Sequence, residues 1–101
     1  MSKELNIIKE KIAQNKEYLL KTYGVEEIGV FGSFAHGDQT SESDIDIIVN
    51  LNHKRVPLGL LKYFDLQNFL EKNLDRKVDL VTEKSIRPAF RKYIMPTIQY
   101  I

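Results

Sequence analysis

Two aspartates separated by one residue, Asp44 and Asp46, are the part of this sequence best suited to chemistry. They belong to residues 44–49, an otherwise apolar run that predicts a strand. Residues i and i+2 of a strand project from the same face, about 6.5–7 Å apart, so both carboxylates are expected to point to one side. Such a pair can bind Mg²⁺ and leave coordination positions for water and phosphate oxygens. The alternative is a strand with one polar, solvated face.

A glycine and a serine, Gly32 and Ser33, follow the short apolar run 28–31, which predicts another strand. A strand that ends this way before a helical turn presents backbone N–H groups and a hydroxyl, and glycine allows close approach of a phosphate. An ordinary turn is the alternative. The loop over residues 32–43 would then join a phosphate site to a metal site.

A third carboxylate, Asp79, interrupts the apolar run 77–81, which predicts a further strand. Burying a carboxylate without a partner is costly. If this strand lies beside residues 44–49, Asp79 faces the same site, where it could bind metal or accept a proton from an attacking hydroxyl. The alternative is a carboxylate at the sheet edge that pairs with Arg76 or Lys77.

Two helices are expected in the first three quarters of the chain. Residues 3–23 have helical spacing, with Ser2 as N-cap and Gly24 at the left-handed C-cap position. Residues 57–74 predict a second helix, which Pro57 can open. Their expected core-facing residues are Leu5, Ile8, Ile12 and Leu19 in the first helix, and Leu58, Leu61, Phe64, Phe69 and Leu74 in the second.

A last helix is expected over residues 85–94, with Ser85 as N-cap and Pro96 ending it. Residues 97–101 alternate enough to form a terminal strand. The order of elements predicts a compact α/β domain, with a small mixed sheet flanked by helices. A length of 101 residues suits a single domain, residues 1–101. The residues expected to stack on the last helix are Ile86, Phe90 and Ile94.

The composition narrows the class of protein. The chain has 15 basic and 14 acidic residues, a net charge of +1, which disfavours a protein that binds nucleic-acid phosphates. It has no cysteine, so a disulfide scaffold, a thiolate metal site and a cysteine nucleophile are excluded. No apolar run approaches the roughly 18 residues of a membrane span, and the N-terminus lacks a signal-peptide pattern. We therefore expect a cytoplasmic protein that binds neither nucleic acid nor membrane.

The combination of Gly32-Ser33, Gly37, Asp44-Ile45-Asp46 and Asp79 resembles the DNA polymerase β-type nucleotidyltransferase superfamily. The length of the chain looks closest to the minimal nucleotidyltransferases, the MNT antitoxins encoded beside HEPN-domain toxins. The resemblance covers residues 26–101 and implies a polymerase β-like nucleotidyltransferase fold.

The resemblance also implies roles for individual residues. Gly32 and Ser33 would hold the β- and γ-phosphates of ATP. Asp44 and Asp46 would ligate two Mg²⁺ ions, and Asp79 would bind the catalytic metal and help to deprotonate the acceptor hydroxyl. The chain has His36 where many relatives have an arginine, and a neutral imidazole is the weaker phosphate partner.

The function implied by the resemblance is transfer of AMP from ATP to a tyrosine hydroxyl of a partner HEPN RNase toxin, within a hetero-oligomer. A second possibility is an antitoxin that masks its toxin by contact alone. A third is a small-molecule nucleotidyltransferase. Such enzymes usually carry a helical substrate domain, for which no residues remain here.

Overall fold

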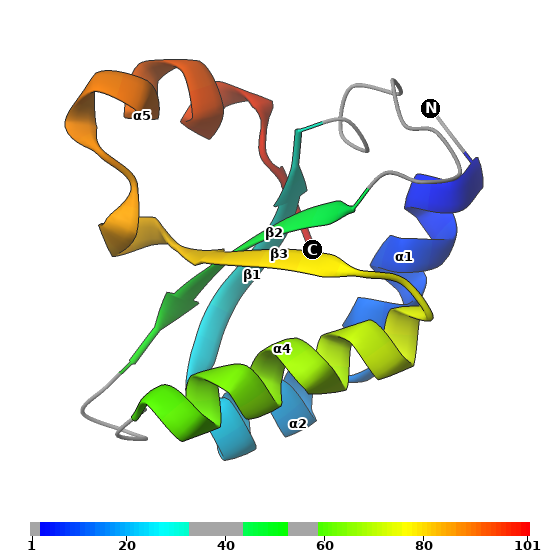
Figure 1. Cartoon of the computed structure of the whole chain (residues 1–101). Coiled ribbons are helices and arrows are strands. Elements are labelled where there is room, and N and C mark those ends of the chain that lie inside the picture. Colours follow the sequence, from blue (N-terminus) through cyan, green and yellow to red (C-terminus); the bar gives the residue numbers. More distant parts are fainter. Residues whose placement is uncertain (1–2, 33–43, 53–58) are drawn as a thin grey trace.

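The computed structural model describes residues 3–32, 44–52 and 59–101. Helices and strands are interspersed along the chain as Figure 1 shows, which confirms the expected α/β class. None of the helices in the described ranges is long and apolar enough to cross a membrane. The elements are α1 (Lys3–Gln14), α2 (Lys16–Tyr23), β1 (Val25–Phe31), β2 (Ile45–Leu51), α4 (Leu60–Leu74), β3 (Val78–Thr82), α5 (Pro88–Ile94) and β4 (Gln99–Tyr100), with 3-10 turns at Glu83–Ser85 and Met95–Thr97.

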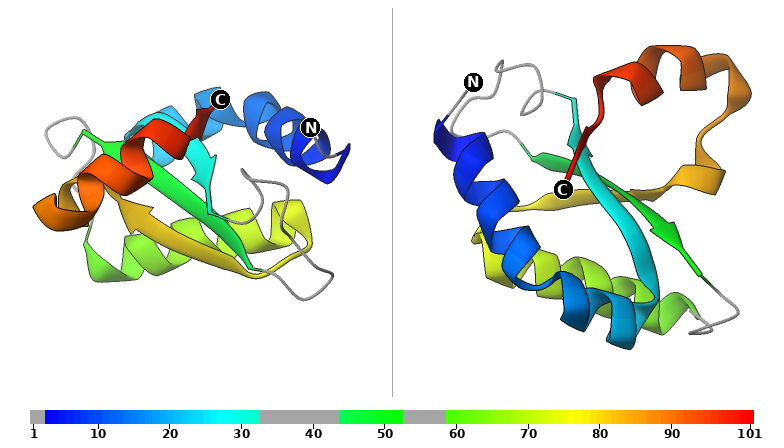
Figure 2. Two further views of the ribbon diagram at one scale, coloured as in Figure 1. Left: turned by 90° about the horizontal axis from the view of Figure 1, so that it is seen from above. Right: turned by 180° about the vertical axis from the view of Figure 1, so that it is seen from behind.

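The four strands form one mixed sheet in the order β3-β2-β1-β4. Strand β1 pairs antiparallel with β2 and β4, whereas β2 and β3 run parallel. Helices α1, α2 and α4 cover one face of the sheet, and α5 lies on the opposite side (Figure 2). The expected small mixed sheet flanked by helices is therefore confirmed.

The hydrophobic core lies between the sheet and helices α1, α2 and α4. Because successive residues of a strand point to opposite faces, Ile45, Ile47 and Val49 of β2 are all buried toward these helices. Asp46 lies between two of them and therefore points to the other face. The helices contribute the buried side chains of Leu5, Ile8, Ile12, Leu19, Leu66, Leu70 and Leu74.

The predicted first helix is interrupted once. Asn15 separates α1 from α2, and its side-chain amide donates to the carbonyl oxygen of Lys11 at 2.9 Å. Such a local bond competes with the helical backbone bonds, so an unbroken helix over residues 3–23 was wrong. Gly24 has φ 72° and its N–H bonds to carbonyls of α2, which confirms the left-handed C-cap. The predicted N-cap Ser2 lies outside the described residues.

The predicted apolar face of the second helix was wrong at its N-terminal end. Helix α4 begins at Leu60, and Pro57 and Leu58 lie outside the described residues. Leu61 is 83% exposed and Phe64 50% exposed, so neither is a core residue. The buried stripe instead recurs every four residues, at Leu66, Leu70 and Leu74, while Phe69 packs against the edge of the core.

The last helix begins later than predicted. Helix α5 starts at Pro88, a favourable first helical position for proline, and Arg87 precedes it as N-cap. Ser85 ends a 3-10 turn, and its hydroxyl donates to the carbonyl oxygen of Thr82 at 2.8 Å instead of capping α5. None of the seven residues of α5 is buried, and Phe90, one of the three residues expected to stack on this helix, is 53% exposed. The terminal strand is shorter than residues 97–101.

Candidate active site

Asp46 of β2 and Asp79 of β3 are direct partners in the parallel ladder. Paired residues of neighbouring strands project to the same face of a sheet, so the two carboxylates share the face opposite the helical core. Phe31 at the end of β1 is the partner of Asp46 on its other side. The sheet therefore brings Asp46 and Asp79 together from positions 33 residues apart.

The third carboxylate, Asp44, lies just outside the strand in which it was predicted. Strand β2 begins at Ile45, and Asp44 precedes it as an exposed residue. It is still close enough for its charge to act on Asp46. The strand-face argument therefore holds for Asp46, whereas Asp44 lies at the position directly before the strand.

Burial and the two neighbouring carboxylates together change the titration of Asp46. Burial raises its pKa from 3.8 to about 6, with further contributions from the charges of Asp79 and Asp44 and from a side-chain hydrogen bond with Asp79. Desolvation and like charges both disfavour the ionised carboxylate. A cation placed among these groups would remove that penalty.

Gly32 lies directly against Asp46. Its φ of 72° is in the left-handed region, which favours glycine, and a Cβ atom built on it would overlap Oδ2 of Asp46 and lie 3.1 Å from Cγ. The backbone conformation thus favours glycine, and a larger residue would have to displace the Asp46 carboxylate. The turn after β1 approaches the carboxylate site at this point. Ser33, which was predicted to bind phosphate, lies outside the described residues, as do His36 and Gly37.

Asp79 differs from its predicted setting. It is exposed rather than buried, because it points to the face away from the helical core, whereas its neighbours Val78 and Leu80 are buried. The guanidinium of Arg76, one of the partners considered for it, lies 3.4 Å from the Glu4 carboxylate. Tyr63 of α4 is a neighbour that the sequence did not single out, and its pKa is raised by burial and by the charge of Asp79.

The donor chemistry of this site fits Mg²⁺. Carboxylate oxygens are the ligands that this cation prefers, and the mutual repulsion at Asp46 would be relieved by positive charge. Within residues 3–32, 44–52 and 59–101, no three His, Asp or Glu side chains already form a group that could hold a metal ion. The side chains would have to turn toward a common point when a cation binds.

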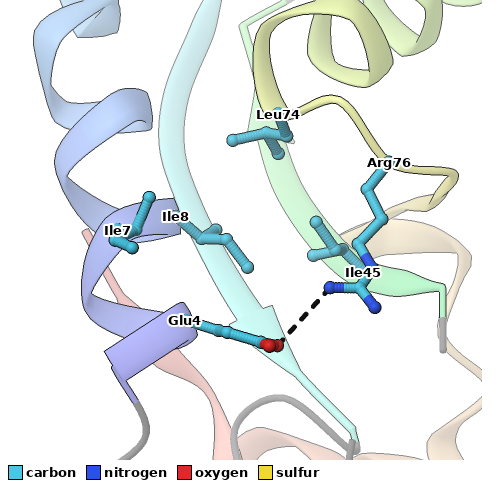
Figure 3. Close-up of a pocket in the computed structure, with 6 residues that line it drawn as sticks. All are labelled: Glu4, Ile7, Ile8, Ile45, Leu74 and Arg76. Atoms are coloured by element: carbon cyan, nitrogen blue, oxygen red, sulfur yellow. Dashed lines mark hydrogen bonds and ion pairs between the residues drawn. The ribbon is translucent and has the colours of Figure 1, made fainter. Parts of the chain in front are cut away.

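A hollow on the helical side of the sheet is separate from this site. It is lined by six residues and has a volume of about 110 Å³, with the Glu4–Arg76 ion pair beside it (Figure 3). Ligand pockets for small molecules usually measure about 300–1,000 Å³, so it is too small for a nucleotide. Its lining residues are Glu4, Ile7, Ile8, Ile45, Leu74 and Arg76.

Known proteins with similar sequences and folds bear on this site. Residues 8–101 match the family model of the nucleotidyltransferase domain. A Methanocaldococcus jannaschii protein, whose assignment as a protein adenylyltransferase is provisional, is 43% identical over 100 residues, which cover 98% of this chain and 99% of the relative. The protein adenylyltransferase MntA of Thermococcus cleftensis is 35% identical over 97 residues, 96% of this chain and 95% of that protein.

A solved structure has a similar fold. A chain from a crystal structure of a toxin–antitoxin with AMP-PNP has a TM-score of 0.71 and 26% identity to this chain, and the match covers 91% of this chain and 70% of that chain. The mixed sheet and the paired carboxylates thus occur in a chain that matches nucleotidyltransferases over nearly its whole length. The protein belongs to the nucleotidyltransferase domain family and is an enzyme of that family.

Proposed function

We propose that residues 1–101 act as one minimal nucleotidyltransferase domain, an antitoxin that transfers AMP from ATP to a tyrosine hydroxyl of a partner HEPN RNase toxin and thereby neutralises it. The enzyme would act in the cytoplasm, in a hetero-oligomer with that toxin. The observation that carries the proposal is the pairing of Asp46 with Asp79 on the face of the sheet opposite the helical core. Asp44 lies close enough for its charge to act on Asp46. The names of the relatives and the nucleotide analogue in the similar toxin–antitoxin structure support it.

In the proposed site, Asp44, Asp46 and Asp79 would hold two Mg²⁺ ions together with the triphosphate of ATP. The bound ions would neutralise the negative charge of the phosphates. Gly32 and Ser33 would hold the β- and γ-phosphates through backbone N–H groups and the serine hydroxyl. Because Gly32 has no side chain, the phosphates and the Asp46 carboxylate could both come close to its backbone.

The chemistry would be an in-line displacement at the α-phosphorus. The tyrosine oxygen forms a bond to this phosphorus, and the bond from phosphorus to the pyrophosphate oxygen breaks, so that pyrophosphate leaves. The hydroxyl proton passes to Asp79, whose exposure at the sheet edge leaves it accessible to a protein substrate. Holding both reactants in this geometry would supply much of the rate enhancement.

The experiment uses two samples of ATP, one labelled on the α-phosphate and one on the γ-phosphate, with Mg²⁺ and the purified partner toxin. Nucleotidyl transfer places the α-label on the toxin and releases the γ-label in pyrophosphate. Asp46→Asn should abolish labelling, whereas Glu10→Gln, which changes an exposed carboxylate of α1, should not.

Two outcomes would contradict the proposal. Neutralisation of the toxin without any label would assign the antitoxin effect to masking by contact. Label that appears on a small hydroxylated acceptor, but not on the toxin, would point to a small-molecule nucleotidyltransferase.

A further inference from the structure

Three side chains of α4 bond to the outer edge of β3, the edge that no strand covers in the described sheet. The hydroxyl of Tyr63 donates to the carbonyl oxygen of Leu80. The side-chain amide of Gln67 donates to the carbonyl oxygen of Val78 at 3.1 Å. The carboxylate of Glu71 accepts the N–H of Val78 at 3.0 Å.

These three residues, which we call the edge clamp, are spaced four apart along α4. Residues at this spacing lie on one side of a helix. The next stripe of the same helix, Leu66 and Leu70, is fully buried in the core. The edge clamp therefore ties β3 to a helix that is itself fixed by packing.

The bonds of the edge clamp lie on either side of Asp79. Backbone groups of successive strand residues point to opposite edges, so Val78 and Leu80 face α4 while the groups of Asp79 face β2. The strand is thus held on its outer edge immediately before and after the aspartate. A shift of β3 along or away from β2 would break bonds on both edges at once.

We propose that Tyr63, Gln67 and Glu71 are positioning residues that hold Asp79 opposite Asp46. This inference rests on the proposed role of Asp79 in nucleotide transfer. The edge clamp touches the β3 backbone, not the nucleotide, so its loss should slow the chemical step more than it weakens ATP binding. It also covers backbone groups of an edge strand that would otherwise be open to pairing with another chain.

The test compares the full-length wild type with the double variant Tyr63→Phe/Gln67→Met, which removes two donors and keeps similar side-chain size. The control is Tyr93→Phe/Gln14→Met, which makes the same changes at exposed positions. A second pair of variants tests the bond from the Val78 N–H to the Glu71 carboxylate. Glu71→Gln keeps an acceptor oxygen and should behave as wild type, whereas Glu71→Met loses it.

We expect the double variant to lower kcat at least about tenfold, with the KM for ATP changed by less than about threefold. Mn²⁺ affinity, measured by electron paramagnetic resonance without nucleotide, should also fall about tenfold. Hydrogen exchange of the Val78 amide should accelerate, most clearly in Glu71→Met. The control pair and Glu71→Gln should change none of these quantities.

Faster exchange in β3 with wild-type kcat and Mn²⁺ affinity would overturn the positioning role and leave only protection of a strand edge. Unchanged hydrogen exchange would show that the edge clamp does not hold the strand, and would also overturn the positioning role. If the wild-type protein transfers no nucleotide, the proposed function fails, and the Mn²⁺ affinities of the same variants still decide whether the edge clamp positions Asp79.

Discussion

Replacing Asp46 by asparagine should stabilise the metal-free protein at neutral pH, although it removes a residue of the proposed site. The folded state raises the pKa of this carboxyl from 3.8 to about 6, so the folded protein binds the proton more tightly than the unfolded chain does. The protonated carboxyl therefore stabilises the folded state. This contribution is fully present below about pH 4 and is lost as pH rises through about 6. Asparagine has no such titration.

The size of the gain follows from that difference in pKa. At about 1.4 kcal/mol per pH unit, a rise from 3.8 to about 6 corresponds to roughly 3 kcal/mol. The carboxyl is only half-buried, so solvent screening reduces this to about 1–2 kcal/mol. For a domain of this size, each kcal/mol shifts Tm by about 4–8 °C.

The assay is thermal unfolding in a chelating buffer at about pH 4 and about pH 7.5, with Glu10→Gln as a control. We expect Asp46→Asn to exceed wild type in Tm by about 5–10 °C at the higher pH and by little at the lower. Millimolar Mg²⁺ should then raise the Tm of the wild type and not that of the variant, because only the wild type keeps the carboxylate that we propose to bind the ion. A variant less stable than wild type at about pH 7.5 without metal would refute the reasoning.

Three further substitutions test backbone positions where a glycine, or a left-handed conformation, matters. Gly32→Ala should lose about 1–2 kcal/mol of stability and weaken ATP binding in a titration with Mg²⁺, because the φ of Gly32 is positive and the added Cβ would meet Asp46. The control Gly59→Ala, whose Cβ meets nothing within 4 Å, should keep the wild-type affinity for ATP. Gly29→Ala should destabilise by about 1–3 kcal/mol in denaturant unfolding, since its Cβ would lie 2.6 Å from Cγ2 of Ile98 beside β4; a neutral result would show that β4 is not firmly packed. Asp75→Gly should stabilise by roughly 1 kcal/mol, because residue 75 caps α4 with φ 53°; a lower Tm would contradict this.

Much of the carboxylate site could be predicted from local pattern. Alternation along β2 correctly placed Asp46 on the face opposite the buried Ile45 and Ile47, and the apolar run around Asp79 correctly indicated a strand. The order of strands in the sheet, which places Asp79 beside Asp46 at an exposed edge, depends on pairing between distant segments. No periodicity within one segment contains that information.

Other features were missed because tertiary contacts decide them. Helical spacing alone fits both Phe64 and Leu66 as core residues, and only packing against the sheet selects Leu66. The bonds from Tyr63 and Gln67 to the β3 backbone join a side chain to main-chain groups 11 or more residues away. Backbone acceptors carry no sequence signal, so tyrosine and glutamine at these positions look like ordinary surface or packing residues.

The central claim, that Asp79 serves covalent transfer to the toxin, is tested most directly by Asp79→Asn. Asparagine keeps the shape of an exposed side chain, so folding and complex formation should be unaffected. The measurement is the intact mass of the toxin after reaction with ATP and Mg²⁺, alongside growth rescue of cells that express the toxin. We predict that wild type adds the mass of one or more AMP groups and rescues growth, whereas Asp79→Asn binds the toxin, leaves its mass unchanged and fails to rescue. Full rescue by Asp79→Asn with an unmodified toxin would contradict the account and assign neutralisation to contact alone.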